Sequence, residues 1–236
     1  MRVEQILNAA SEMFMSQGYE ASRIEEIAHC AGVSPATVYN YFSTKANILT
    51  ALAVQHARRS VPARRALIRN PPEDPLAAVQ AFEKLLADQA LKTLGRECWR
   101  VIFAAPYTQP NSPLHKAGMR FNRLILRHYV QMLQEFQRRG AIGPDVDIVV
   151  LADLFTALGT HHFGSFISSD SMTLEQMKLA IEKHVTLAFS GIRMKPDAAL
   201  KSAPIRCIAP SDPKGDGAEE IGTPPKPTRR RRASAG

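Results

Sequence analysis

The sequence predicts an all-α protein, and three observations support that fold class. Apolar residues recur three and four positions apart along most of the first 194 residues, which is the period of a helix buried on one face. Several of these stretches begin with serine, threonine or aspartate, in places followed by proline, and end at glycine, which are common signals for helix starts and stops. The alternation of apolar and polar residues that is typical of strands is scarce, and only 7% of the residues are aromatic.

The first expected helix covers residues 2–16 and ends before Gly18, a residue that tolerates the backbone conformation of a turn. Its apolar residues form a single stripe, which would pack onto the helices that follow. The stripe consists of Val3, Ile6, Leu7, Ala10, Met13 and Phe14.

Residues 24–45 predict two short helices joined at Gly32. The second helix has its own start signal, because Ser34 can cap free amide groups and Pro35 lacks an N–H where none is needed. Val38 and Phe42 share one face and would point into a core. The remaining faces carry small and polar groups with a tyrosine at each margin, namely Ala36, Thr37, Asn40, Tyr39 and Tyr41. This is the outline of a helix-turn-helix whose second helix suits the major groove of DNA.

A fourth helix is expected over residues 45–58, and the proline-rich segment 70–75 then interrupts the helical pattern. Five more helices are expected at residues 75–94, 96–105, 113–139, 145–168 and 173–192. From Lys195 onward, the composition changes to proline, alanine, serine, glycine and charge, which predicts a disordered basic tail. The expected domains are a DNA-binding domain at 1–55, a helical ligand-binding and dimerisation domain at 56–194, and the tail at 195–236.

The helix expected at 145–168 is apolar on nearly every side, which predicts burial on two faces. One face can pack into its own domain, and we expect the other to meet a second copy of the chain. The neighbouring helix at 173–192 would complete a four-helix seam between the copies. The residues expected at this dimer interface are Leu151, Leu158, Phe166, Met177, Ile181 and Val185.

Longer motifs surround the helix-turn-helix in a fixed order. From Ile6 to Leu52 the chain reads Ile-Leu-x-Ala-Ala-x-x-x-Phe-x-x-x-Gly-Tyr, then Ile-Glu-Glu-Ile-Ala, then Ala-Gly-Val-Ser-x-x-Thr-Val-Tyr-x-Tyr-Phe, then Lys45 and Ile48-Leu49. In these motifs the chain resembles the N-terminal DNA-binding domain of the TetR family of transcriptional regulators. The resemblance covers about the first 55 residues, and the rest of the chain matches that family only in length and helical layout.

The resemblance implies that the segment from Ser34 to Tyr41 enters the major groove. The groups expected to face base edges are the backbone of Pro35 and Ala36 and the side chains of Thr37 and Asn40. The residues expected at phosphates are Tyr39, Tyr41, Lys45 and Ser22, the last at the expected cap of the preceding helix. Two features depart from the family: Glu25-Glu26 stand where relatives often carry a basic residue, and only Arg2 precedes the first helix, where many relatives have a basic arm.

Charge is distributed unevenly along the chain. The formal net charge is +8, yet residues 1–55 hold three basic residues against five acidic ones, a net charge of −2. Arginines cluster instead between residues 58 and 69 and at 229–232. DNA binding would then depend on a few placed phosphate contacts and on geometry, with diffuse attraction from elsewhere.

The larger domain also offers candidates for a small-molecule site, which the resemblance implies. Aromatic and methionine residues at helical spacing could line a cavity, although packing in a core is the ordinary interpretation of such a set. Arginines nearby would allow an anionic or carboxylate-bearing ligand, though long arginines on helices usually face water. The candidates are Trp99, Phe103, Tyr107, Met119, Phe121, Arg123, Phe155 and His162.

No catalytic site, metal site or cofactor is predicted. The sequence contains no phosphate-binding loop, nucleophile elbow, zinc-protease motif or distinct carboxylate pair, and its histidines and three cysteines show no metal-binding spacing. Because no run of 18 apolar residues and no signal peptide occurs, we expect a cytoplasmic protein, associated with the nucleoid when bound to DNA and without a membrane partner.

The predicted function is that of a non-enzymatic transcriptional regulator that acts as a repressor. It would bind a palindromic operator in double-stranded DNA as a homodimer and respond to a small-molecule effector. The main alternative is a ligand-independent DNA-binding regulator or architectural protein that uses the same helix-turn-helix. A helical enzyme or scaffold, in which the helix-turn-helix only packs, is disfavoured by the outward polar residues of the second helix.

Overall fold

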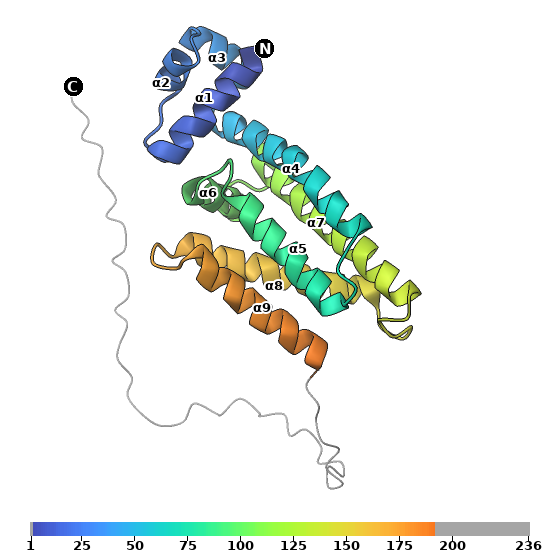
Figure 1. Cartoon of the computed structure of the whole chain (residues 1–236). Coiled ribbons are helices and arrows are strands. Elements are labelled where there is room, and N and C mark those ends of the chain that lie inside the picture. Colours follow the sequence, from blue (N-terminus) through green and yellow to red (C-terminus); the bar gives the residue numbers. More distant parts are fainter. Residues whose placement is uncertain (1, 192–236) are drawn as a thin grey trace, which may run out of the picture. The chain divides into compact units, whose positions relative to one another are not determined.

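The computed structural model describes residues 2–191, and this part of the chain folds into nine helices without a strand, which confirms the predicted fold class (Figure 1). The helices are α1 (Arg2–Ser16), α2 (Ile24–Cys30), α3 (Pro35–Phe42), α4 (Lys45–Arg69), α5 (Pro75–Ala90), α6 (Arg96–Thr108), α7 (Pro113–Arg138), α8 (Ile148–Ser168) and α9 (Leu174–Ser190). None of these helices is long and apolar enough to cross a membrane. The tail expected at 195–236, with its arginine run, lies outside the described residues.

Helices α1, α2 and α3 pack together through the apolar stripes that the sequence predicts. Ile6 of α1, Ile27 of α2 and Val38 of α3 are fully buried. Gly32 makes the turn between α2 and α3 with a φ of +66°, a backbone conformation that favours glycine. We call residues 2–44, which contain these three helices, the reading head.

The predicted start signals are helix caps in the structure. Ser34 Oγ accepts a hydrogen bond from the backbone N–H of Thr37 (3.2 Å), and Pro35 occupies the first position of α3. A capping side chain followed by proline also opens α5 at Asp74 and α7 at Ser112. These caps depend only on neighbouring residues, and for that reason the sequence predicts them well.

Helix α4 is longer than predicted. The sequence predicts its end near Arg58, but it continues to Arg69 with Pro62 inside it. Proline removes one backbone donor and usually ends or kinks a helix. Here a buried stripe continues on both sides of the proline, through His56 and Arg64, and α4 packs along α7. These tertiary contacts stabilise the helix across Pro62.

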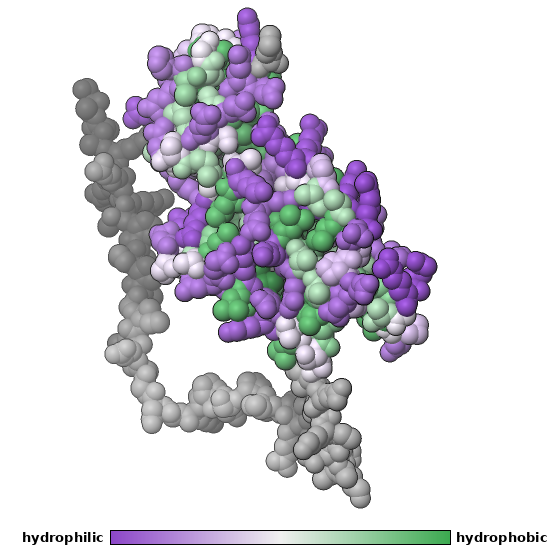
Figure 2. All heavy atoms as spheres, viewed as in Figure 1, coloured by the Kyte–Doolittle hydropathy of each residue, from purple (hydrophilic) through white to green (hydrophobic). Residues whose placement is uncertain are grey.

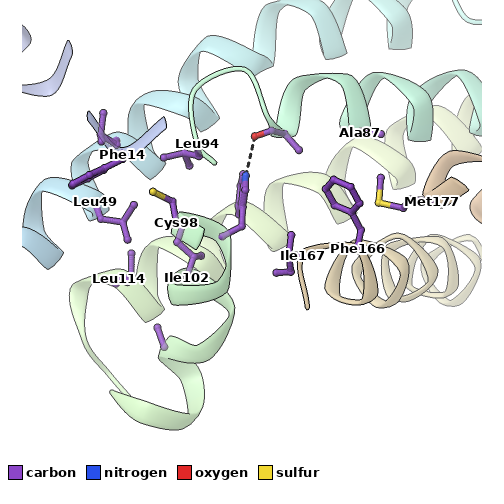
Figure 3. Close-up of a cluster of buried hydrophobic side chains, with 14 of the residues drawn as sticks. Phe14, Leu49, Ala87, Leu94, Cys98, Ile102, Leu114, Phe166, Ile167 and Met177 are labelled. Carbon is purple, nitrogen blue, oxygen red and sulfur yellow. Dashed lines mark hydrogen bonds between the residues drawn. The ribbon is translucent and has the colours of Figure 1, made fainter. Parts of the chain in front are cut away.

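One hydrophobic core extends from the reading head through the remaining helices. Figure 3 follows it from Phe14 of α1 and Leu49 of α4, past Leu94 and Cys98, to Phe166 of α8. Helix α4 also runs unbroken across residues 55 and 56, where the sequence places a domain boundary. The reading head is therefore joined to the rest of the fold by a shared helix and a shared core.

Helices α8 and α9 pack on each other, on α7 and on α5. On its inner side α8 buries Ala152 and Phe155. On its outer side Val149, Val150 and Leu154 are 56%, 65% and 44% exposed, so this helix is buried on one side only within the single chain. Figure 2 shows hydrophobic residues that reach the surface among polar ones on the helical body.

Candidate functional site

The structure gathers most of the residues expected at DNA on the outer surface of α3. The exposed members are Ser34, Pro35, Ala36, Tyr39, Asn40 and Tyr41. Thr37 is half-buried, and its Oγ1 lies 2.9 Å from Ser34 Oγ, so its hydroxyl takes part in the helix cap. Contact with DNA stays a prediction for all of these residues, but their placement on one exposed helix face is what base readout requires.

The two tyrosines of α3 have different surroundings. The Tyr39 hydroxyl donates a hydrogen bond to Glu25 Oε1 on α2 (3.1 Å), and this bond raises the pKa of the Tyr39 phenol. Tyr41 is 51% exposed, and its hydroxyl makes no hydrogen bond to the described residues. Glu25 therefore orients Tyr39 from the neighbouring helix, whereas the hydroxyl of Tyr41 is available for a phosphate.

Lys45 has a structural role that the sequence does not reveal. Its Nζ donates hydrogen bonds to the backbone carbonyls of Tyr19 (2.8 Å), Glu20 (3.1 Å) and Ser22 (3.1 Å), and it lies 4.5 Å from the centroid of the Tyr19 ring. A lysine ammonium has three donors, and all three have acceptors here. Its expected phosphate contact stays a prediction, but Lys45 would have to give up part of this loop contact to make it.

The prediction that Ser22 caps α2 is wrong. The cap position is occupied by Arg23, whose backbone N–H donates to Glu26 Oε2 (3.3 Å). The Ser22 side chain is 1% exposed, and its hydroxyl donates to the carbonyl of Gly18 (2.6 Å). The loop folds back on itself between α1 and α2, which buries the hydroxyl that was expected to face a phosphate.

A cavity of about 310 Å³ lies between helices α4 to α9. Six of the eight predicted ligand residues line it: Trp99, Phe103, Tyr107, Met119, Phe121 and Phe155. Tyr107 and Met119 are 88% and 50% exposed, whereas Phe155 is buried. The cavity is mostly apolar, as small-molecule sites commonly are.

The other two predicted ligand residues do not line the cavity. Arg123 is exposed on α7. His162 is buried against α9 instead, where its ring centroid lies 4.8 Å from that of His184. Although His161 also lies nearby, no group of three His, Cys, Asp or Glu side chains within residues 2–191 could hold a metal ion.

Two polar residues of α4 line the cavity and were not predicted. Arg64 is 1% exposed, and its Nε donates to Gln89 Oε1 (2.8 Å). His56 is 3% exposed, and its Nδ1 lies 2.7 Å from the Thr93 hydroxyl. Arg64 Nη1 and His56 Nε2 are buried without a hydrogen-bond partner in the described part of the chain. Burial, with the nearby Arg64 charge, lowers the pKa of His56 to about 4, so its ring is neutral near pH 7.

The sequence does contain a signal for these two residues. His56, Ser60 and Arg64 follow Leu49 and Leu52 at intervals of four, so they continue the inward stripe of α4 along the same face. The proline at 62 and the arginine-rich composition instead suggest that the helix ends before Arg64. Only an unbroken α4 places the guanidinium inside the fold.

Glu83 of α5 is a third polar group in the cavity wall. It is 4% exposed, and its Oε1 accepts a hydrogen bond from the hydroxyl of Tyr129. Burial raises the pKa of Glu83 to about 7, because removal from water disfavours the charged carboxylate. A side chain at Gly159 would come within 2.9 Å of this carboxyl, so the glycine makes room for it.

The structure corrects most of the predicted dimer interface. Phe166, Met177, Ile181 and Val185 are at most 4% exposed within the single chain, because they face its own core, so they cannot meet a second copy. Leu151 and Leu158 are half-buried. The outward apolar residues of these helices are Val149, Val150 and Leu154 on α8 and Leu179 and Leu187 on α9. For these four residues the sequence predicts the outward face, whereas the structure buries them, and a contact of α8 and α9 with a second copy stays a prediction.

Two contacts join the reading head to elements of the cavity wall. Ser11 Oγ of α1 donates to the carbonyl of Thr93 (3.0 Å), the residue whose hydroxyl lies beside His56. Glu97 of α6 accepts hydrogen bonds from the backbone N–H groups of Tyr19 (2.9 Å) and Glu20 (2.8 Å). The helix that carries Glu97 also carries Trp99 and Phe103, which line the cavity.

Comparison with known proteins gives consistent results for the reading head. Residues 6–52 match the family described as bacterial regulatory proteins, tetR family. The chain is 34% identical over 110 residues to the transcriptional activator FasR of Mycolicibacterium smegmatis, which covers 45% of this chain and 48% of FasR. It is 24% identical over 154 residues to the transcriptional regulator UidR of Escherichia coli K12, which covers 65% of this chain and 75% of UidR. The match to FasR thus spans about half of that protein.

Solved structures share the fold over a greater length. FadR of Thermus thermophilus, a TetR-family repressor solved in complex with lauroyl-CoA, is 20% identical with a TM-score of 0.61, covering 84% of this chain and 98% of FadR. FadR of Bacillus subtilis, solved in complex with stearoyl-CoA, is 19% identical with a TM-score of 0.58, covering 77% of this chain and 96% of that chain.

Proposed function

We propose that this chain is a transcriptional regulator of the TetR family, as the match at residues 6–52 suggests, and that it represses its target genes by binding a palindromic operator as a homodimer. The observation that carries the proposal is the outer face of α3, where Pro35, Ala36, Asn40 and Tyr41 are exposed together while Val38 anchors the helix from behind. This arrangement offers small and polar groups to base edges and a phenol hydroxyl to the backbone.

Two reading heads in one dimer would enter successive major grooves on the same side of the duplex. Their half-sites would lie about one helical turn apart, roughly 34 to 36 Å. Because the first 55 residues carry a net charge of −2, few phosphates would be neutralised, and operator affinity would fall only gently with salt.

The second copy would pack against the outward residues of α8 and α9. Val150, Leu154 and Leu187 expose apolar surface that a four-helix seam would bury. Such a seam fixes the distance between the two heads, and this distance selects operators by their half-site spacing.

The cavity is proposed to hold an apolar effector that releases the operator. Helix α4 begins directly behind α3 and reaches the cavity wall at His56 and Arg64, and α6 contacts both the cavity and the loop before α2. A ligand that prefers one position of these helices would change the spacing of the heads. To shift the equilibrium between two spacings of the heads from 1:99 to 99:1, the ligand must bind one state more tightly by about 5.5 kcal/mol. Two ligands per dimer would share this difference.

The relatives differ in the sign of their regulation. FasR is an activator and the Thermus FadR is a repressor. We assign repression because a rigid homodimer that is released by an effector needs no contact with polymerase. A promoter that carries the selected operator should be silenced by the full chain in a reporter assay, and higher expression would instead assign activation.

Selection of binding sites from random duplexes by the purified full chain tests the DNA-binding part of the proposal. The expected result is an inverted repeat with half-sites about one turn apart. Enrichment of single half-sites or direct repeats would contradict the symmetric dimer, and a lack of any enrichment would contradict operator binding. Lys92→Ala is a suitable control, because that exposed lysine lies after α5, outside the reading head and the cavity lining, and should leave the selected sequence unchanged.

A further inference from the structure

Arg64 is a buried cation without an anion. No carboxylate of the described residues lies within ion-pair distance of its guanidinium, and Gln89 supplies only a neutral acceptor. The guanidinium carbon lies 5.0 Å from the centroid of the Phe121 ring, which offers it a weak cation–π contact. Burial of a charge without a counter-charge is unfavourable, and the described residues offer no anion that would offset this cost.

The unpaired donor and a second free polar atom belong to the same cavity. Arg64 Nη1 and His56 Nε2 are both buried without a partner among residues 2–191, and both residues contact Phe121 and line the cavity wall. A neutral His56 whose Nδ1 accepts from the Thr93 hydroxyl carries its proton on Nε2. Two N–H groups would then lie near Phe121 in the wall of a mostly apolar cavity.

Glu83 does not remove this positive potential. Its carboxyl is engaged by the hydroxyl of Tyr129, and its pKa of about 7 keeps a substantial part of it protonated near neutral pH. The cavity volume of about 310 Å³ lies at the lower end of the range for small-molecule sites, roughly 300 to 1,000 Å³. Trp99, Ile102 and Phe163 provide apolar and aromatic surface for the body of a ligand.

We propose that the effector is a small apolar carboxylic acid, whose carboxylate pairs with Arg64 Nη1 and accepts a hydrogen bond from His56 Nε2 while its apolar body fills the cavity. The effector role rests on the proposed function, whereas the carboxylate site does not. The ligand supplies an anion that the described residues do not offer to Arg64, and it makes this contact on α4, the helix that follows the reading head.

The single tryptophan of the chain, Trp99, lines the cavity and reports binding in the full-length protein. Emission is titrated with octanoate, decanoate and 3-phenylpropionate, with 1-decanol as the uncharged match and decanoyl-CoA as the thioester. The expected result is binding of at least one acid, with 1-decanol bound at least tenfold more weakly than decanoate. No response to any acid up to its solubility limit, or equal binding of alcohol and acid, would overturn the proposal.

Arg64→Met tests the residue, and Arg65→Met, the exposed neighbour on the same helix, is the matched control. Loss of one partner of a buried charge pair costs about 2 kcal/mol or more, so Arg64→Met should weaken acid binding at least about thirtyfold. Arg65→Met should bind as the wild type does. Thermal melting checks that both variants are folded, and Arg64→Lys, which keeps the charge, should retain more acid binding than Arg64→Met.

Three further results separate the proposal from the function on which it rests. Acid binding that is unchanged in Arg64→Met overturns the carboxylate site, even if the acid still releases the operator from the wild type. Decanoyl-CoA that binds more tightly than decanoate and is insensitive to Arg64 would also overturn it, in favour of a thioester effector. Binding that depends on Arg64 but leaves operator affinity unchanged supports the carboxylate site and contradicts the effector role.

Discussion

The carboxylate of Glu97, in the first turn of α6, accepts a hydrogen bond of 2.9 Å from the backbone N–H of Tyr19 in the reading head. Its second oxygen binds the next amide, of Glu20, and Lys45 binds the carbonyls of the same loop from the other side. The loop before α2 is therefore held between α6 and α4, the two helices that also reach the cavity. This loop is where we expect motion in the larger domain to reach the DNA-binding surface.

Glu97→Ala should uncouple the cavity from the reading head. Two backbone donors lose their acceptor, so stability should fall by about 1 to 3 kcal/mol. Ligand affinity, measured by Trp99 emission, should change little, whereas the effect of the ligand on operator affinity should shrink. Glu12→Ala, which removes an exposed glutamate of α1, is the control. A variant that responds to ligand as fully as the wild type would exclude Glu97 from the coupling.

Gly18→Ala should destabilise the protein more than Gly32→Ala. Both glycines have positive φ, +91° and +66°, but a side chain at Gly18 would come within 2.1 Å of Glu97 Oε2, whereas nothing lies within 4 Å of one at Gly32. Gly32→Ala should cost about 1 kcal/mol for the backbone alone. In urea denaturation, Gly18→Ala should lose at least about 1 kcal/mol more of the free energy of unfolding than Gly32→Ala loses.

The same comparison in a Glu97→Ala background isolates the contact. Removal of the carboxylate should abolish the excess cost of alanine at Gly18, because the two changes affect one interaction. Equal costs at the two glycines in the wild-type background would contradict the close approach of Glu97.

Lys45→Met should lower stability, since three carbonyl acceptors in the loop before α2 lose their charged donor. A loss of about 2 kcal/mol is expected, which would lower Tm by roughly 4 to 8 °C. Lys92→Met, at an exposed position after α5, is the matched control. If Lys45→Met has the same Tm as the wild type but a lower operator affinity, Lys45 binds a phosphate and does not stabilise the loop.

Glu83→Gln should change how stability depends on pH. A carboxyl whose pKa rises from 4.5 in the unfolded chain to about 7 in the fold binds more protons when folded, so its contribution to stability falls as the pH rises between these values. The wild type should therefore lose stability relative to Glu83→Gln between pH 5 and pH 8, by up to about 3 kcal/mol.

The buried His56 has a pKa lowered to about 4, so its contribution to stability rises with pH at lower pH values. This contribution is the same in the wild type and in Glu83→Gln. Denaturant unfolding at each pH measures the difference between wild type and Glu83→Gln. A difference that is constant from pH 5 to pH 8 would show that Glu83 titrates at its ordinary pKa.

Leu154→Glu should dissociate the proposed homodimer, because it places a charge on the outward apolar face of α8. Val3→Glu, at a similarly exposed apolar residue of α1, is the control and should leave the dimer intact. Light scattering coupled to size exclusion gives the mass directly. A dimeric Leu154→Glu variant would locate the interface elsewhere on the chain.

The sequence predicts the local features of this fold well. Helix starts at Ser34, Asp74 and Ser112 depend on a capping side chain and an adjacent proline, and the core positions of α2 and α3 follow from helical period. The end of α4 was predicted too early, because Pro62 breaks an isolated helix but not one that is packed along α7. The missed continuation is a tertiary effect that no local signal records.

The candidate site is only partly predictable for the same reason. The family resemblance implies a small-molecule site with aromatic residues such as Trp99 and Phe103 as candidates, and these two residues line a cavity. The loop carbonyls that bind Lys45 and the placement of Arg64 depend on how distant segments meet. Likewise, helical period indicates that α8 and α9 are apolar, but only the packed structure shows that Val185 faces inward and Leu187 outward.

The central claim, that the outer face of α3 reads DNA, is tested most directly by operator affinity in fluorescence anisotropy with a labelled duplex that carries the selected site. Asn40→Ala combined with Tyr41→Ala should weaken binding by at least about tenfold, since base and phosphate contacts of about 1 kcal/mol or more each are lost, while thermal melting and dimer mass stay unchanged. Lys45 is left intact because it stabilises the loop before α2. Affinity equal to that of the wild type in this folded double variant would contradict the account.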